Sequence, residues 1–172
     1  DKSVKYLVIG DGRMRNVLEN RTKELKISDF VEFLGEMPND QEYKYMDLAK
    51  VVVFPSSAEA MSIACIEAMM IGTPVVATKI GGLVDLLGEN NLFGILVDLF
   101  GNRVSTYEAP LIKSIPKEKY REFAQRILES LHGQNNELAA KAKKFAREKY
   151  SWETLIDLIL SFSYKESEKE SY

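Results

Sequence analysis

The feature that most constrains the fold is a repeated alternation of short apolar runs with helix-periodic segments. The runs are rich in β-branched residues and end at glycine, proline or small residues, which is typical of buried strands. After the first run, Met14, Val17 and Leu18 recur at helical spacing. Strands that alternate with helices over short connections predict an α/β fold with a parallel sheet of about five strands, covered by helices. The expected strands are 4–9, 30–34, 51–54, 74–78 and 94–97.

Helices are expected between these strands and again after the last one. Asn39 or Asp40 is expected to cap the helix that follows, and Ser151 to cap the final one. The expected helices are 13–26, 41–50, 62–71, 83–87, 117–132 and 136–150, with one more after Ser151. The expected division is a domain core over 1–98, a loop or insertion over 99–116, C-terminal helices that pack on the domain over 117–163, and a disordered tail over 164–172.

The stretch from Pro55 to Pro74 carries two carboxylates, Glu59 and Glu67, with seven residues between them. Glu59 stands in a loop of small residues, where it could face a reacting sugar. Glu67 stands in an apolar helical segment, about 7.5 Å along the helix from Ser62. A carboxylate with such neighbours needs hydrogen-bond donors, and the two vicinal hydroxyls of a ribose offer two. The two carboxylates are therefore expected to have separate tasks.

Four loops of small residues are predicted to meet at the carboxyl edge of the sheet, where folds of this type bind their ligands. Small side chains let a ligand approach backbone N–H groups, and the positive end of a helix that begins near Ser62 suits a phosphate. A nucleotide diphosphate is therefore the expected ligand. The loops are Gly10-Asp11-Gly12, Gly35, 56–62 and Gly81-Gly82.

Composition argues against several other classes of function. Lysine and arginine number 23 against 26 aspartates and glutamates, a net charge of −3, so no basic field for nucleic acid is expected. The single Cys65 excludes an internal disulfide and a cysteine cluster for zinc. The single His132 removes most histidine metal sites and a Ser-His-Asp triad. No run reaches the roughly 18 to 20 apolar residues of a membrane span. We expect a cytoplasmic protein with no metal site and no nucleic-acid partner.

Each signal also has an ordinary structural interpretation when it is taken alone. A glutamate in a helix is usually solvated or paired with a cation, and Gly-Asp-Gly after a strand is a common turn. Cys65 fits a small, inert core residue, and His132 fits a partner of a helix C-terminus. The functional hypothesis therefore depends on the joint arrangement of the motifs.

In order and spacing, the motifs resemble the C-terminal, donor-binding domain of a retaining GT-B glycosyltransferase of family 4, the glycosyl transferases group 1. The resemblance covers about residues 5–98. The family's E-x7-E signature matches Glu59 to Ala77, and its G-G-x-x-E/D loop matches Gly81 to Asp85. The other matching segments are the G-D-G turn at 10–12, the v-x-F-x-G strand at 31–35, the strand ending in P-S at 49–56 and the G-x-L-V strand at 94–97.

The resemblance implies a Rossmann-like domain that binds a nucleotide diphosphate sugar, with a UDP- or GDP-sugar as donor. Glu67 would hold the donor ribose, and Glu59 would be the catalytic carboxylate at the donor sugar and its departing phosphate. The N–H groups of Ser62 and Ile63 would meet the diphosphate, and backbone near Gly35 would border the base. The donor-binding residues implied are Gly12, Gly35, Met37, Ser62, Ile63, Glu67 and Gly82.

The chain departs from the family pattern at the sugar loop, where Ala60 and Met61 replace the usual Gly and Phe. The family's basic pair, which grips the diphosphate, and its acceptor-binding domain both lie upstream of the first strand seen here. We do not expect Arg13 or Arg15 to replace that pair, and we expect this polypeptide alone to be inactive. Family members transfer sugar with retention and without an obligatory metal, so no cofactor besides the donor is expected.

Two alternatives stay open on the sequence. One is a non-catalytic module or subunit that binds a nucleotide sugar, which the Ala60-Met61 replacement favours. The other is a different nucleotide-sugar enzyme on the same scaffold, such as an epimerase. The resemblance implies a glycan or lipid-linked acceptor bound by the missing N-terminal domain. A lipid-linked acceptor at a membrane surface is common in the family, and the sequence leaves peripheral association with the inner membrane surface open.

Overall fold

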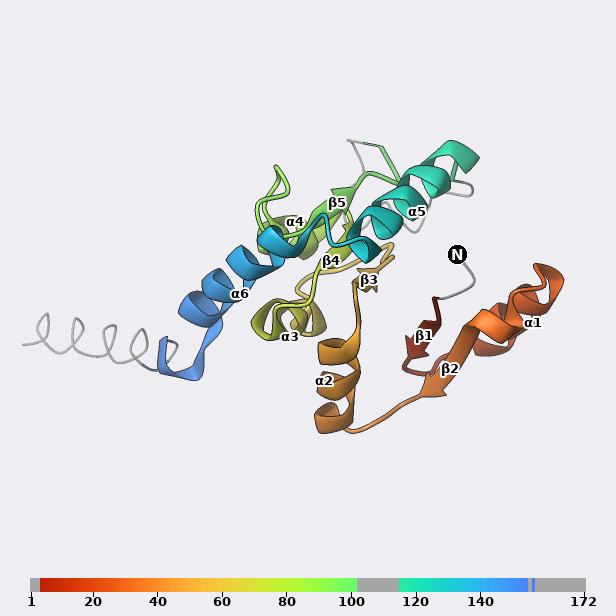
Figure 1. Cartoon of the computed structure of the whole chain (residues 1–172), viewed down its shortest axis with the longest axis horizontal. Coiled ribbons are helices and arrows are strands. Elements are labelled where there is room, and N and C mark those ends of the chain that lie inside the picture. Colours follow the sequence, from red (N-terminus) through yellow and green to blue (C-terminus); the bar gives the residue numbers. More distant parts are fainter. Residues whose placement is uncertain (1–3, 102–114, 155, 157–172) are drawn as a thin grey trace, which may run out of the picture. The chain divides into compact units, whose positions relative to one another are not determined.

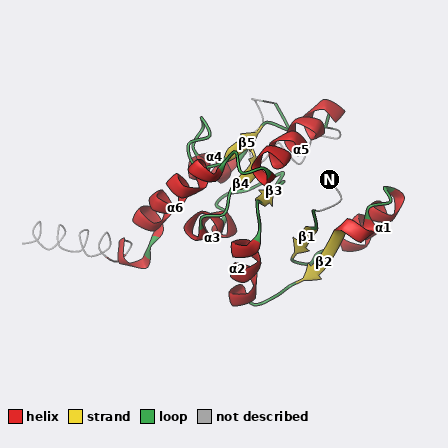
Figure 2. Ribbon diagram, in the orientation of Figure 1, coloured by secondary structure: helices red, strands yellow, loops and turns green. Residues whose placement is uncertain are grey.

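The computed structural model describes residues 4–101, 115–154 and 156 (Figure 1). The chain divides into two compact units, Asp1–Tyr45 and Met46–Tyr172, called here the N-terminal and the C-terminal unit. Helices and strands alternate in both, as Figure 2 shows. The boundary between the units falls within helix α2, Asn39–Leu48.

The N-terminal unit contains a two-stranded parallel sheet. Strand β1, Tyr6–Ile9, pairs with strand β2, Val31–Gly35, in a register that places Tyr6 opposite Val31 and Ile9 opposite Gly35. Helix α1, Arg15–Glu24, and a short 3-10 helix η1, Ser28–Phe30, connect the two strands. This is the parallel strand–helix–strand order that the sequence predicts.

Helix α2 begins two residues earlier than expected. The predicted loop residues Asn39 and Asp40 lie inside its first turn instead of capping it from outside. The carbonyl oxygen of Pro38 accepts the N–H groups of Gln41 and Glu42, so the helical hydrogen bonds start at Pro38. The cap prediction was wrong for this reason.

The C-terminal unit contains a three-stranded parallel sheet in the order β3-β4-β5. Its strands are β3, Val52–Phe54, β4, Val75–Thr78, and β5, Ile95–Val97. Helix α3, Ile63–Ile71, follows β3, and helix α4, Gly81–Leu87, follows β4. The five predicted strands and their parallel pairing are confirmed, with β1 and β2 paired in the N-terminal unit and β3, β4 and β5 paired in the C-terminal unit.

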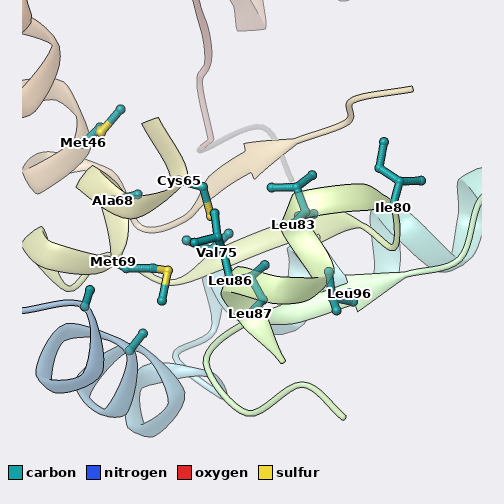
Figure 3. Close-up of a cluster of buried hydrophobic side chains, with 13 residues drawn as sticks. Met46, Cys65, Ala68, Met69, Val75, Ile80, Leu83, Leu86, Leu87 and Leu96 are labelled. Atoms are coloured by element: carbon teal, nitrogen blue, oxygen red, sulfur yellow. The ribbon is translucent and has the colours of Figure 1, made fainter. Parts of the chain in front are cut away.

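Helices cover both faces of the three-stranded sheet. Side chains alternate across a strand, and so Val75 and Ala77 face one way while Val76 faces the other. The first face packs against α3, α4 and the helix α6, Asn136–Tyr150, in a cluster that Figure 3 shows. The second face packs against the helix α5, Lys117–Leu131, through Phe123. This arrangement confirms a Rossmann-like α/β architecture.

Helix α3 is held between the sheet and α6. Cys65, Ala68 and Met69 of α3 are fully buried, and Ala142 and Ala146 of α6 pack in the same cluster (Figure 3). Small alanines on α6 let the two helices approach closely, as their extensive mutual contact reflects. The position of α3 is therefore fixed by a well-packed core.

The C-terminal end of α3 is capped by glycine and by cations from α6. Gly72 follows the helix with φ +95°, a left-handed conformation that side chains disfavour. The Nε of Arg147 donates to the carbonyl oxygen of Met70 over 3.3 Å, and the side chain of Lys143 crosses Gly72. Positive charge at this end complements the helix dipole.

Further along the chain, Ser151 caps the next helical turn as predicted, because its hydroxyl oxygen accepts the Thr154 N–H over 3.2 Å. Most of the predicted loop at 99–116 and of the chain after Thr154 lies outside the described residues. Within the part of the chain that the structure describes, no helix combines the length and the apolar character needed to cross a membrane.

Candidate functional site

The predicted site residues lie in both units and are described unit by unit. Gly12, Gly35 and Met37 belong to the N-terminal unit, at the ends of β1 and β2. The remaining residues belong to the C-terminal unit, where they lie in the loop before α3, in α3 itself and at the start of α4. They are Glu59, Ser62, Ile63, Glu67 and Gly82.

In the N-terminal unit, the turns after β1 and β2 are joined by backbone. The N–H of Gly10 donates to the carbonyl oxygen of Gly35 over 2.7 Å, and both glycines have positive φ, +105° and +74°. The Gly12 N–H donates to the Asp11 carboxylate over 2.6 Å. Gly35 is buried and Met37 is half-buried. The predicted residues of this unit therefore sit on one pair of linked strand ends.

Arg15 is the basic residue that reaches these turns, and its charge is matched locally. Its guanidinium donates to Asp11 and to Glu19, each over 2.9 Å, and to the carbonyl oxygen of Phe33 over 3.1 Å. The Gly12 N–H and the Arg15 guanidinium lower the pKa of the Asp11 carboxyl. Two carboxylates pair with the charge of Arg15, and the bond to Phe33 makes it a link between α1 and β2.

In the C-terminal unit, Ser62 forms the N-cap of α3. It has an extended backbone, and its hydroxyl oxygen accepts the N–H of Cys65 over 3.3 Å. The following residue, Ile63, is 69% exposed. Its N–H belongs to the first helical turn, where helix geometry supplies no acceptor within the helix. Open N–H groups and the positive end of the helix dipole suit an anionic ligand here.

Both carboxylates of the signature are half-buried. Glu59 lies in the loop before α3, and its negative charge acts on the thiol of Cys65 in the first turn of the helix. Burial is the larger effect on that thiol, and together they raise the pKa of Cys65 from 9.0 to about 12. Glu59 thus stands three residues before the N-cap Ser62, in the segment that leads into α3.

Gly82 supports the Glu59 loop from α4. Its N–H donates to the carbonyl oxygen of Glu59 over 3.0 Å. A Cβ at Gly82 would overlap the carbonyl oxygen of Ala60 and lie 2.8 Å from its carbonyl carbon. Gly82 was predicted from its motif, but the reason for the glycine is this contact between two backbones.

Thr78 is a residue of the site that was not predicted. It is fully buried at the end of β4, and its hydroxyl donates to the carbonyl oxygen of Ser56 over 2.6 Å. By residue type, this threonine does not differ from the other β-branched residues of the strand. Its place at a strand end, three residues before Gly81, was the available signal.

The arrangement can bind an anion at the start of α3 and hold a carboxylate beside it. Hydrogen-bond donors and a helix dipole placed where negative charge develops stabilise a leaving group such as a diphosphate. Among the described residues, no group of three or more His, Cys, Asp or Glu side chains is placed to hold a metal ion.

A family model matches residues 1–105 of the chain, and its description is "Glycosyl transferases group 1". A relative among the curated proteins is an uncharacterized glycosyltransferase of Methanocaldococcus jannaschii. It is 30% identical over 153 residues, which are 89% of this chain and 35% of that protein.

Two solved structures have a similar fold. Sucrose-phosphate synthase of Thermosynechococcus elongatus aligns with a TM-score of 0.69 and 25% identity, over 96% of this chain and 39% of that one. HepE of Anabaena, solved in complex with UDP, aligns with a TM-score of 0.70 and 20% identity, over 96% and 42%. HepE has also been solved with UDP-glucose.

The chain spans between about a fifth and two fifths of the length of the curated relatives it matches. The part matched is thus a minor share of each relative.

Proposed function

The chain belongs to the glycosyl transferases group 1 family, and from this premise we propose that it is the donor-binding part of a glycosyltransferase. In this proposal the whole protein transfers a hexose from a nucleotide diphosphate sugar to an acceptor, with retention at the anomeric carbon. Residues 1–98 form the nucleotide-sugar-binding core, and the helices from 117 onward pack on it. The observation that supports the proposal is the loop of Glu59, which is bonded to Gly82 and leads directly into the capped start of α3, with Glu67 further along that helix.

The diphosphate is proposed to bind at the start of α3. The N–H groups of Ser62 and Ile63 lie in the cap and first turn, and Ile63 is exposed. As the bond between sugar and phosphate breaks, negative charge builds on the departing diphosphate. Fixed N–H donors and the helix dipole stabilise that charge without reorganisation, which lowers the barrier. No metal is needed for this step in the proposal.

The two carboxylates take separate tasks. Glu67 is proposed to accept hydrogen bonds from the ribose hydroxyls, and Glu59 to lie at the donor sugar. A half-buried carboxylate on a rigid helix holds a fixed part of the ligand well, while one in a loop beside the helix start can meet the reacting group. The loop position and the helix position thus fit the two roles.

The residues of the N-terminal unit are proposed to serve the nucleotide. Backbone from Gly35 to Met37 borders the base, and the turn that contains Gly12 also binds the donor. A UDP-sugar is favoured as donor because the fold is similar to that of HepE, which has been solved with UDP and UDP-glucose. A GDP-sugar is the second donor class to be tested.

The acceptor is proposed to be a glycan or a lipid-linked sugar bound by a separate N-terminal domain of the whole protein. A cytoplasmic location follows in this proposal from the nucleotide-sugar donor and from the lone, buried Cys65. With a lipid-linked acceptor, the protein would work at the inner membrane surface. This chain by itself is expected to be inactive.

Calorimetry on the whole protein tests the proposal, with UDP-glucose and GDP-mannose as probes and ATP as a control. Binding of one sugar nucleotide in the micromolar range, and not of ATP, is expected. Absence of binding by any UDP- or GDP-sugar would overturn the proposal. Release of UDP or GDP with a retained anomeric product separates a transferase from an epimerase, which returns an altered sugar nucleotide.

A non-catalytic binding module is the second candidate, and the exposed Ala60 and Met61 in the sugar loop favour it. Such a module would bind the sugar nucleotide but not turn it over. Turnover by the whole protein that is abolished in Glu59→Gln decides against this candidate.

A further inference from the structure

The loop that carries Glu59 is attached to the protein core at two carbonyl groups. The hydroxyl of Thr78 donates to the carbonyl oxygen of Ser56 over 2.6 Å, and the N–H of Gly82 donates to the carbonyl oxygen of Glu59 over 3.0 Å. Thr78 is the last residue of β4, and Gly82 lies in the first turn of α4. The loop is therefore fixed at its start and at Glu59 itself by residues some twenty positions further along the chain.

The Thr78 attachment is buried. Thr78 has no exposed surface, and its hydroxyl also lies 3.4 Å from the carbonyl oxygen of Phe54. A hydroxyl has one hydrogen to donate, and the 2.6 Å distance makes Ser56 its main acceptor. Without the hydroxyl, a carbonyl group in this enclosed region would lose its partner, which is costly. The Thr78 hydrogen bond therefore stabilises the observed backbone conformation of the loop.

The Gly82 attachment is both a hydrogen bond and a steric fit. A Cβ at this position would meet the Ala60 carbonyl group and lie 3.1 Å from the Cα of Met61. These are backbone atoms, so an alanine would have to push the whole loop away. The φ of Gly82 is outside the left-handed range that favours glycine, so close approach is what requires glycine here.

The attached loop fixes the backbone of Glu59 in the segment that leads into α3, since the N-cap Ser62 follows Glu59 by only three residues. The charge of Glu59 also contributes to the raised pKa of the Cys65 thiol in the first turn of that helix. The backbone between the two attachments is only the stretch from Ser56 to Glu59. Little freedom is left for the carboxylate to drift from the helix start.

We propose that Thr78 and Gly82 are positioning residues that hold Glu59 at the start of α3, and that neither contacts the donor. This inference rests on the proposed function of Glu59. Since the N–H of Gly82 is occupied by the Glu59 carbonyl group, its contribution is to the loop and not to the diphosphate. Loss of either attachment should lower turnover far more than affinity for the nucleotide.

The test compares Thr78→Val and Gly82→Ala with wild type in the whole protein. Turnover is followed as release of UDP or GDP from the sugar nucleotide that wild type uses, and affinity for UDP alone is measured by calorimetry. We expect kcat to fall at least about tenfold in both variants. The Kd for UDP should stay within about twofold of wild type, because UDP lacks the sugar near Glu59. Thr78→Ser, which keeps the hydroxyl, should recover most of the turnover.

Thr73→Val is a matched control. Thr73 is also a buried threonine, 5% exposed, and its hydroxyl donates to the carbonyl oxygen of Met46 over 2.7 Å, away from the Glu59 loop. Gly94→Ala is the matched glycine, since a Cβ there would meet the side chain of Leu87 and not the loop. Both controls should lose stability but keep kcat within about twofold of wild type.

Hydrogen exchange measured by mass spectrometry gives a readout that does not depend on activity. Peptides covering residues 55–62 and 79–83 should exchange faster in Thr78→Val and Gly82→Ala than in the two controls. If these peptides exchange faster and kcat is nevertheless unchanged, the positioning role is wrong while the proposed function stands. The positioning role is also wrong if UDP affinity falls as much as kcat. If wild type turns over no sugar nucleotide, the proposed function fails, and exchange still reports whether the loop is attached.

Discussion

Ser62 and Cys65 are joined across the first turn of α3, where the N–H of Cys65 donates to the Ser62 hydroxyl oxygen over 3.3 Å. Ser62 is itself 6% exposed, so no water competes freely for this bond. The cap defines where the helix begins and therefore which N–H groups stay open. Both the stability of the helix and the anion site proposed at its start depend on this bond.

Replacing the cap should destabilise the protein by a moderate amount. Ser62→Ala removes the acceptor and is expected to cost about 1 kcal/mol of unfolding free energy. Urea unfolding followed by circular dichroism measures it. Ser62→Asn retains a capping acceptor and should stay close to wild type. Equal stability of Ser62→Ala and wild type would contradict a capping role.

Substitution of the two carboxylates should affect the Kd for UDP differently. Glu67→Gln removes the charged acceptor proposed for the ribose. Such a hydrogen bond is worth about 1.5 to 3 kcal/mol, so the Kd for UDP should rise roughly 10- to 150-fold. Glu59→Gln should leave the Kd for UDP nearly unchanged and reduce turnover instead. Calorimetry on the whole protein provides the two Kd values, and release of UDP or GDP provides the turnover. A larger loss of UDP affinity in Glu59→Gln than in Glu67→Gln would reverse the assignment.

The free energy of unfolding should decrease at alkaline pH, and ionisation of the Cys65 thiol should account for part of the decrease. Burial, with a further contribution from Glu59, raises the pKa of the Cys65 thiol from 9.0 to about 12. The unfolded chain therefore loses this proton first as the pH rises above 9, so the contribution of Cys65 to stability is intact below pH 9 and decreases between pH 9 and 12.

Cys65→Ala should show a shallower alkaline loss of stability than wild type over that window. Unfolding by urea at several pH values from about 8 to 11 measures both slopes. The variant also leaves a small cavity, so the slopes and not the absolute values are compared. Parallel curves for the two proteins would mean that the thiol does not contribute.

Gly72 should not tolerate a side chain. Its φ of +95° is unfavourable for other residues, and a Cβ would lie 2.9 Å from the Cδ of Lys143. Gly72→Ala is expected to lose about 1 to 2 kcal/mol of unfolding free energy. Gly12→Ala is the control for stability, because among the described residues no atom lies within 4 Å of a Cβ there. If thermal unfolding finds the two variants equally stable, the left-handed cap is unimportant.

The elements were largely predictable because their signals are local. A strand of apolar β-branched residues such as Val75 and Val76, or a helix between Ser62 and Gly72, is specified by periodicity and by its caps. The predicted start of α2 was wrong by two residues, since a proline carbonyl began its hydrogen bonds. Periodicity identifies a strand but not its neighbours, so the strand order β3-β4-β5 had to come from the structure.

The supporting residues of the site were harder to predict than its carboxylates. Glu59 and Glu67 stand out because charge is unexpected among small and apolar residues. Thr78 looks like an ordinary strand residue, and its task is visible only when the carbonyl group of Ser56 lies next to it. Gly82 stood in a motif, but the reason it cannot carry a side chain is the backbone of a loop over twenty residues away in the sequence. Such roles arise from contacts between distant segments, which a local pattern does not encode.

The bond from Arg147 to the carbonyl oxygen of Met70 spans 77 residues. During synthesis, the loop of Glu59 and the whole of α3 leave the ribosome long before α6, which supplies that bond and the alanines that cover Met69. The nascent chain must therefore wait, with one face of α3 uncovered, until α6 has been made. A ribosome stalled after α5 would present Glu67 on a helix not yet fastened at its far end, with Glu59 in the loop before it.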